Sequence, residues 1–408
     1  MKRSNANVRI LYKSKYMKYI LALFLLLFTF IPLNAQTTAA VVAPEIVTAE
    51  ESDLRKQAFD KVWNTVNERH YDPKFGGVDW AGMRTLYAPQ AEAAKTRDDF
   101  HNVLRKMLAE LKLSHFGILP RNADIQAARK TSGATGIEIK ILDGQPVISR
   151  VEAGSSAATS GIKPGFTVRT IDGMLAIDAL KKIEESFAGR KLTPGIQNVM
   201  RERTVQSLIN GKADTTLKLE VIDEKDGARS FDIARRTFSG EMSQPLGNFP
   251  AQEVIFESKR LPSGIGGMAP GFAGMLLNEK TSLGSMNMRE GEQKFVVYPQ
   301  DNPFLGKVVI LEDYGSASTS EIFISGLQEI GRAKIVGETS AGAVLPSVMD
   351  TLPTGVTFQY AVSDYRSPKN VLVEGRGVPP DVEVKQTRQA LLNGKDLPLE
   401  AAEKIILN

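Results

Sequence analysis

Apolar residues recur along the chain at two different periods, and this difference separates its regions. Between residues 50 and 113 they recur at helical spacing, as Phe100, Leu104 and Leu108 do on one side of a predicted helix. Between residues 136 and 223 they alternate with polar residues or form short runs bounded by Gly-containing turns, which is typical of strands. The hydrophobic pattern therefore predicts an N-terminal helical region followed by a β-rich region.

The C-terminal half adds a strand, a serine-rich turn, a helix and a second strand. Residues 308–311 are a short, continuously apolar run, residues 315–322 form the turn and helix start, and residues 333–336 form the second strand. Ser320 and Glu321 supply N-cap chemistry. We therefore expect a multidomain α/β protein with a hydroxyl at a helix N-terminus. The residues alone leave two interpretations open, a helix cap and a nucleophile beside amides that stabilise an oxyanion.

A family resemblance favours the nucleophile. The Ser-Ala-Ser-x-Ser-Glu-Ile element from Ser316 to Ile322 resembles that of the C-terminal processing (tail-specific) and tricorn-core serine peptidases. The resemblance implies an α/β core of the ClpP/crotonase type, with Ser318 as nucleophile and the Thr319 amide as an oxyanion donor. The processing branch has a lysine where this chain has Ala343, which excludes a Ser-Lys dyad.

The remaining catalytic groups are also implied by the resemblance. Ser114-His115 resembles the Ser-His pair of the tricorn branch, which makes His115 the general base and Ser114 an auxiliary hydrogen-bonding group. A neutral imidazole is the usual base for a serine, so we expect activity to rise through a pH of about 6.5. Residues 372–381 resemble the late acidic motif, with Glu374 orienting the histidine and Asp381 closing a structural turn.

The β-rich region resembles a PDZ domain of exported proteases. The resemblance rests on Ala-Gly-Ser-Ser-Ala at residues 153–157 and Gly-Ile-Lys-Pro-Gly at residues 161–165. PDZ domains add a peptide strand to a sheet edge and hold its terminal carboxylate on backbone N–H groups. A folded spacer is the alternative. The segment that matches the carboxylate loop consists of Gly136, Ile137, Glu138 and Ile139.

One stretch departs from the family. The related peptidases carry an Asp-Leu-Arg-Gly-Asn-Pro-Gly-Gly type motif before the nucleophile strand, and its glycine amide completes the oxyanion hole. No such motif is recognisable here, so the core is expected to be shortened. Gly264 and Gly266 are candidates to supply that amide, because glycine lets the backbone approach a ligand closely. A plain loop leading into a helix is the alternative.

Composition narrows the possible chemistry. The chain has 408 residues, enough for two or three domains, and its apolar and charged fractions are those of a globular protein. It has no cysteine, which excludes disulfides and thiolate catalysis, and its three histidines form no recognisable zinc site, so no metal or cofactor is expected. A formal net charge of +4 gives little support for nucleic-acid binding.

The N-terminus has the pattern of an export signal. Basic residues precede an apolar run at residues 19–33, and Ala35 offers a small residue at a cleavage position. The run is short of the roughly 20 residues that a membrane span needs, so cleavage before Gln36 is predicted and a retained anchor is the alternative. Periplasmic or extracellular localisation follows in both cases, with membrane contact only through a retained leader.

These features predict an exported serine endopeptidase that acts on polypeptides, with a Ser-His-Glu triad and peptide capture by a PDZ-like domain. Two alternatives stay open, a catalytically impaired peptide-binding protein and a hydrolase of small esters or lactones. The predicted segments are a signal peptide (1–35), a tether with the helical region (36–120), a PDZ-like domain (121–228) and the peptidase core (229–408).

Overall fold

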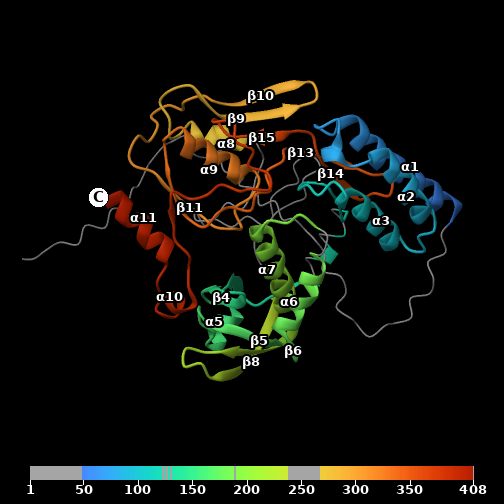
Figure 1. Cartoon of the computed structure of the whole chain (residues 1–408). Helices are drawn as coiled ribbons and strands as arrows, with labels where there is room; N and C mark the ends of the chain where they lie inside the picture. Colours follow the sequence, from blue (N-terminus) through green and yellow to red (C-terminus); the bar gives the residue numbers. More distant parts are fainter. Residues whose placement is uncertain are drawn as a thin grey trace, which may run out of the picture.

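Helices dominate the N-terminal part of the described chain, and strands become frequent after it (Figure 1). The computed structural model describes residues 48–121, 124, 127–128, 131–187, 190–237 and 267–407. The predicted leader, residues 1–35, lies outside these residues. Among the helices that are described, none is long and apolar enough to cross a membrane. The prediction of a mixed α/β protein with a helical N-terminal region and a β-rich region is confirmed.

The N-terminal helices share an apolar core with a small sheet built from distant parts of the chain. Each of the three α-helices begins after a side chain, Thr48, Asp79 or Thr96, that accepts a hydrogen bond from a backbone N–H of the first turn. Phe100 from the helices and Phe358 from the sheet belong to this one core. The elements are α1 (Ala49–Arg69), η1 (Phe75–Gly77), α2 (Trp80–Glu92), α3 (Arg97–Ala109) and the antiparallel strands β1 (Gly117–Leu119), β14 (Thr357–Ala361) and β13 (Ser347–Thr351).

The β-rich unit, green at the bottom of Figure 1, is an antiparallel sheet with helices packed against it. Its strands in sheet order are β2 (Gly133–Ala134), β8 (Ala228–Thr237), β7 (Thr215–Ile222), β5 (Thr167–Ile171), β4 (Gln145–Val151) and β3 (Ile137–Leu142), with β6 (Met174–Leu175) beside β5 and helices α5 (Ser156–Ser160), α6 (Ala176–Glu185) and α7 (Pro194–Asn210). Ile137, Ile139 and Ile141 alternate into the core. Strand β3 is the last strand in this order, and α7 lies against it.

The C-terminal unit contains a parallel strand-helix-strand arrangement, orange to red in Figure 1. The predicted apolar runs at 308–311 and 333–336 form its neighbouring strands, shifted by one residue. The elements are β11 (Val309–Glu312), α9 (Thr319–Glu329), β12 (Lys334–Gly337) and β16 (Val382–Glu383), the antiparallel strands β10 (Gly291–Val297), β9 (Thr281–Met288) and β15 (Asp364–Arg366), and the helices α8 (Met268–Ala273), α10 (Arg388–Leu392) and α11 (Leu397–Leu407).

Helix α9 begins earlier than the sequence indicated. Ser320 was expected to be its N-cap, but the N-cap is Ser318 and the first helical residue is Thr319. The carboxylate of Glu321 explains the earlier start, because it accepts a hydrogen bond from the Ser318 N–H at 3.1 Å. A glutamate at this position commonly reaches back to the N-cap amide. Ser318 therefore stands at the junction between the turn after β11 and the helix.

Candidate active site

Ser318 adopts a backbone conformation that few residues other than glycine adopt. Its φ is 59° and its ψ is −124°, which is strained for an L residue. Its N–H donates to the carbonyl oxygen of Ala343 at 2.8 Å, so a second turn of the chain holds this strained residue in place. The side chain is partly exposed. A sharp turn that presents an accessible hydroxyl at a helix N-terminus suits a nucleophile.

His115 brings a buried imidazole to this hydroxyl from 203 residues away in the sequence. Its Nε2 lies 3.3 Å from Ser318 Oγ, and only 4% of the residue is exposed. Burial lowers the pKa of His115 to about 4, so the ring is neutral near pH 7 and able to accept a proton. Protonation of this imidazole is therefore expected to lower activity only near pH 4. This acid limb of the pH profile lies well below the value of about 6.5 that was expected from the sequence.

Ser114 lies between His115 and the carboxylate of Glu374. Its hydroxyl donates to Glu374 Oε2 at 2.9 Å, and the same oxygen lies 2.7 Å from His115 Nδ1. Because the hydroxyl proton points to the carboxylate, the oxygen accepts from Nδ1–H, which leaves the Nε2 lone pair facing Ser318. Glu374 was expected to orient the ring itself. The structure instead connects it to the ring through Ser114, for which only an auxiliary role was predicted.

Backbone donors surround the partly buried Glu374. Oε1 accepts from Ser114 N at 2.9 Å, and Oε2 accepts from Val344 N at 2.8 Å. Burial raises the pKa of Glu374, and these hydrogen bonds oppose the rise. Asp381, expected to be structural, lies elsewhere in the unit and accepts from Ile335 N of β12 at 2.8 Å. The structure thus gives the two carboxylates of the late acidic motif different surroundings.

The structure describes one of the predicted oxyanion donors, Thr319, but not the two predicted glycines. Thr319 is the first residue of α9, so its amide belongs to the helix N-terminus beside Ser318. Gly264 and Gly266 lie outside the described residues. Ala343, where the processing branch has a lysine, is buried with 5% of its surface exposed. Its methyl group offers no base to Ser318, and the imidazole of His115 stands against the hydroxyl instead.

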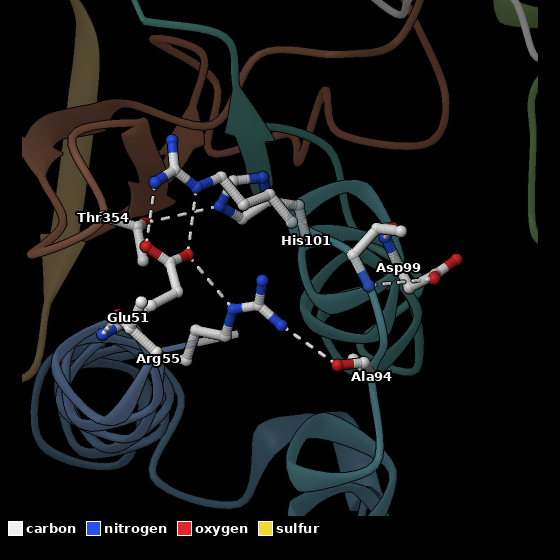
Figure 2. Close-up of polar contacts among 9 residues, drawn as sticks. Glu51, Arg55, Ala94, Asp99, His101 and Thr354 are labelled. Atoms are coloured by element: carbon white, nitrogen blue, oxygen red, sulfur yellow. Dashed lines mark hydrogen bonds and ion pairs between the residues drawn. The ribbon is translucent and has the colours of Figure 1, made fainter. Parts of the chain in front are cut away.

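The other two histidines have structural surroundings. His101 is buried in α3, its Nε2 lies 3.3 Å from Thr354 Oγ1, and burial lowers its pKa to about 4 (Figure 2). Figure 2 also shows Arg55 of α1, which pairs with Glu51 of the same helix and donates to the carbonyl oxygen of Ala94 at 3.0 Å, so that α1 is joined to the segment before α3. His70 is the C-cap of α1, and burial lowers its pKa as well. His101 is thus packed within a helix, and His70 ends one.

The predicted carboxylate loop lies at the start of β3. Gly136 has a φ of 81°, and a Cβ added there would lie 2.2 Å from Ser155 Cβ, so the position requires glycine. Ile137 and Ile139 are buried in the core, whereas Glu138 faces away from it and pairs with an arginine of β4. The segment therefore presents its backbone, rather than its apolar side chains, at the edge of β3 that lies opposite β4.

A side chain of α7 contacts the edge of β3 that lies opposite β4. Gln206 of α7 accepts from Ile139 N at 3.2 Å, and its amide group donates to Ile137 O at 2.8 Å. These are the backbone groups with which an added strand would pair. No sequence pattern predicted this contact, because a side-chain amide on a helix is ordinarily solvated.

Tyr314, from the turn before Ser318, contacts the same edge farther along. Its hydroxyl accepts from Ile141 N at 3.1 Å and also hydrogen-bonds to Glu202 of α7. Lys140 of β3 forms an ion pair with Asp313 at 2.9 Å and lies over the Tyr314 ring, 4.5 Å from its centre. The β-rich unit and the turn that carries the candidate nucleophile are therefore in direct contact.

Comparison with known proteins gives two family matches. Residues 53–109 match the Tricorn protease C1 domain, and residues 268–384 match Peptidase family S41. A carboxyl-terminal-processing protease of Picosynechococcus is 25% identical over 84% of this chain and 85% of its own length. Tricorn protease homolog 1 of Streptomyces coelicolor is 26% identical over 88% of this chain but only 36% of its own length.

Two solved structures share the fold at low identity. The photosystem II D1 C-terminal processing protease is 20% identical, with a TM-score of 0.53 over 89% of this chain and 98% of that chain. Mature CPAF, solved in complex with lactacystin, is 12% identical, with a TM-score of 0.57 over 86% of this chain and 98% of that chain. Both likenesses extend across the helical, β-rich and C-terminal units.

Proposed function

We propose that this chain, a serine peptidase of family S41 and therefore a hydrolase, cleaves polypeptides with Ser318 as nucleophile and His115 as general base. The resemblance that the sequence predicted is confirmed by the family matches. The observation that carries the residue assignment is the series of contacts from Ser318 through His115 and Ser114 to Glu374. A neutral imidazole against a serine hydroxyl is the arrangement that activates serine for acyl transfer.

In the proposed reaction, His115 Nε2 takes the proton of Ser318 Oγ as that oxygen attacks the substrate carbonyl. The imidazolium donates from Nδ1 to Ser114, whose hydroxyl donates to Glu374, so the positive charge is compensated through one intervening hydroxyl. The amide of Thr319 is the proposed donor to the oxyanion. His115 then gives its proton to the leaving amine, the C–N bond breaks, and water releases the acyl group with the same base.

The β-rich unit is proposed to be a PDZ-like domain that captures peptide C-termini along Gly136 to Ile139. Its end was predicted at residue 228, but β8 continues its sheet to Thr237. An edge strand beside a helix is the arrangement in which such domains accept an added strand. Because Gln206 and Tyr314 contact this edge, an incoming peptide has to displace them. The C-terminal unit that follows β8 is proposed to have the ClpP/crotonase architecture.

Export is proposed from the leader. The basic segment, the apolar run at 19–33 and Ala35 support cleavage before Gln36. A relative from Tetradesmus obliquus carries the name C-terminal processing peptidase, chloroplastic, which assigns that protein to a compartment outside the cytosol. Terminal sequencing of the mature protein checks this, and recovery of an intact Met1 from a membrane fraction would contradict it.

A serine-reactive phosphonate probe tests the catalytic proposal. The wild-type chain should be labelled covalently on Ser318 and should hydrolyse a peptide, and Ser318→Ala should do neither. Ser316→Ala, in the same turn, is a matched control that keeps the nucleophile. If wild-type protein takes no label while it still binds peptides, the chain is a peptide-binding protein rather than an enzyme.

A further inference from the structure

Glu321 is the most deeply buried carboxylate beside the site, and the proposed reaction does not use it. It is 0% exposed, and hydrogen-bond donors approach both of its oxygens. Oε1 accepts from Ser340 Oγ at 2.6 Å and from Gly342 N at 2.7 Å, and Oε2 accepts from Ala343 N at 3.0 Å and from Ser318 N at 3.1 Å. One side chain thus joins the turn that carries Ser318 to the turn between β12 and β13.

The turn at Ser318 contains strained backbone that needs outside support, and the turn at Gly342 is closely packed. Ser318 has a φ of 59°, and Gly342 has a φ of 71° with backbone atoms of Arg376 and Gly377 too close for any side chain. A non-glycine residue in the conformation of Ser318 persists only when its surroundings determine it. The contacts of Glu321 to the amides at 318, 342 and 343 supply that support, because a carboxylate accepts from several N–H groups at once.

We propose that Glu321 is a positioning residue whose ionised carboxylate fixes the Ser318 backbone so that its hydroxyl stays against His115. The inference rests on the proposed function. Protonation would turn one acceptor oxygen into a donor facing N–H or O–H groups, which would break at least one of these contacts. Activity therefore needs the ionised form of Glu321, although this residue touches neither the substrate nor the reacting atoms.

The charges around Glu321 place its titration near neutral pH. Burial raises the pKa of Glu321 to about 7, its hydrogen bonds with Ser340 and the two amides of the second turn oppose that rise, and the negative charge of Glu374 adds to it. Burial also raises the pKa of the neighbouring Glu312 to about 9, so that side chain stays neutral. The phenol of Tyr365, which faces the same region, has a pKa raised by burial and is neutral as well.

Activity is expected to fall as the pH is lowered through the pKa of Glu321. Glu321 is ionised above its pKa of about 7 and loses its charge as the pH falls through that value. His115, whose pKa is about 4, is still a neutral base in that range. An acid limb near 7 therefore reports Glu321, and a limb near 4 reports His115. The two groups are separable by the position of the limb alone.

The test is the pH dependence of peptide hydrolysis and phosphonate labelling in variants of the full chain. Glu321→Gln should lower kcat by about 10- to 100-fold with KM changed less than about twofold, because misplacing the nucleophile affects chemistry rather than binding. Its residual rate should lack the limb near 7. Glu329→Gln on the same helix is the control, because its side chain accepts from Lys369 N and glutamine keeps that contact. It should leave the rate and the limb unchanged.

A second variant keeps the carboxylate in case Glu321→Gln does not fold. Ser340→Ala removes a hydrogen bond that favours the ionised form, so its acid limb should move to higher pH than that of the wild type. An unmoved limb in both variants, or a wild-type limb only near 4, overturns the inference while the enzyme remains a peptidase. A wild-type chain that neither hydrolyses nor labels overturns the proposed function instead, and this inference with it.

Discussion

The contacts around Ser318 and those along β3 are built alike, yet they stand in opposite relations to function. In both, backbone N–H groups from one segment are bound by side chains from a distant one, as Glu374 binds Val344 N and Gln206 binds Ile139 N. The proposed catalysis needs the first set intact. The proposed peptide capture needs the second set broken, because an added strand uses the same donors and acceptors.

The difference lies in what replaces each contact when it is lost. Around Ser318 a lost partner leaves a buried polar group unsatisfied, which costs about 1–3 kcal/mol. Along β3 an incoming peptide offers its own backbone groups, so the exchange conserves hydrogen bonds and the net cost is small. Side chains of intermediate exposure such as Gln206 and Glu202 suit this second use. Similar geometry therefore serves a permanent scaffold in one region and an exchangeable cover in the other.

The largest expected effect comes from breaking the active-site set at its centre. Ser318→Ala and His115→Ala should each lower kcat/KM by about 10,000-fold or more, and the double variant should lose little beyond either, because the two residues act as one unit. Steady-state hydrolysis of one peptide by all three proteins measures this. Full activity in His115→Ala contradicts the assignment of the base. His101→Ala, which removes an imidazole far from Ser318, is the matched control.

The next effect tests whether Ser114 is the connection between ring and carboxylate. Ser114→Ala and Glu374→Gln should each lower kcat by about 100-fold or more, since each leaves the imidazolium without its compensating charge. Combining them should add little, because both remove the same connection. Single-turnover labelling by a phosphonate compares the three variants directly. Strictly multiplicative losses would show that Glu374 acts on the site by a route other than Ser114.

These two regions also show which features could be predicted from the sequence and which could not. It predicted the helical N-terminal region and the β-rich region, because apolar periodicity is a local property. It nominated Ser318, His115, Ser114 and Glu374 through motifs, and the structure brings these four side chains together. It did not predict that Ser114 intervenes between His115 and Glu374. That arrangement depends on a hydrogen bond between residues 260 apart, which no local pattern encodes.

The same limit applies to the surroundings of these residues. Glu321 was assigned only to helix capping, since its partners at 340 to 343 become visible when two turns meet in space. The contact of Gln206 with β3 spans 67 residues and was missed for the same reason. Gly264 and Gly266 remain predictions, because they lie outside the described residues.

A smaller effect is expected from uncovering β3. Gln206→Ala should strengthen binding of a peptide with a free C-terminus by about 3- to 10-fold, because it removes the competitor for two backbone groups of β3. Fluorescence titration with free-acid and amidated peptides measures this, and amidation should weaken binding to both proteins. Gln197→Ala on the same helix is the control, since that side chain binds Leu192 O instead. Weaker binding by Gln206→Ala would mean that the amide holds the peptide rather than excluding it.

The smallest effect is expected from Tyr314→Phe, where the two regions meet. The change removes a hydroxyl that accepts from Ile141 N at 3.1 Å, but Glu202 still accepts from that amide at 3.3 Å, so no donor is left unsatisfied. Peptide affinity should therefore rise only about twofold, the low end for one neutral hydrogen bond. The ring keeps its place over Lys140, so phosphonate labelling of Ser318 should stay within about twofold of wild type. Titration and labelling of the same preparation give both numbers. A large fall in labelling would mean instead that the hydroxyl positions the turn leading to Ser318. The contacts that cover β3 would then also help to hold the nucleophile in place.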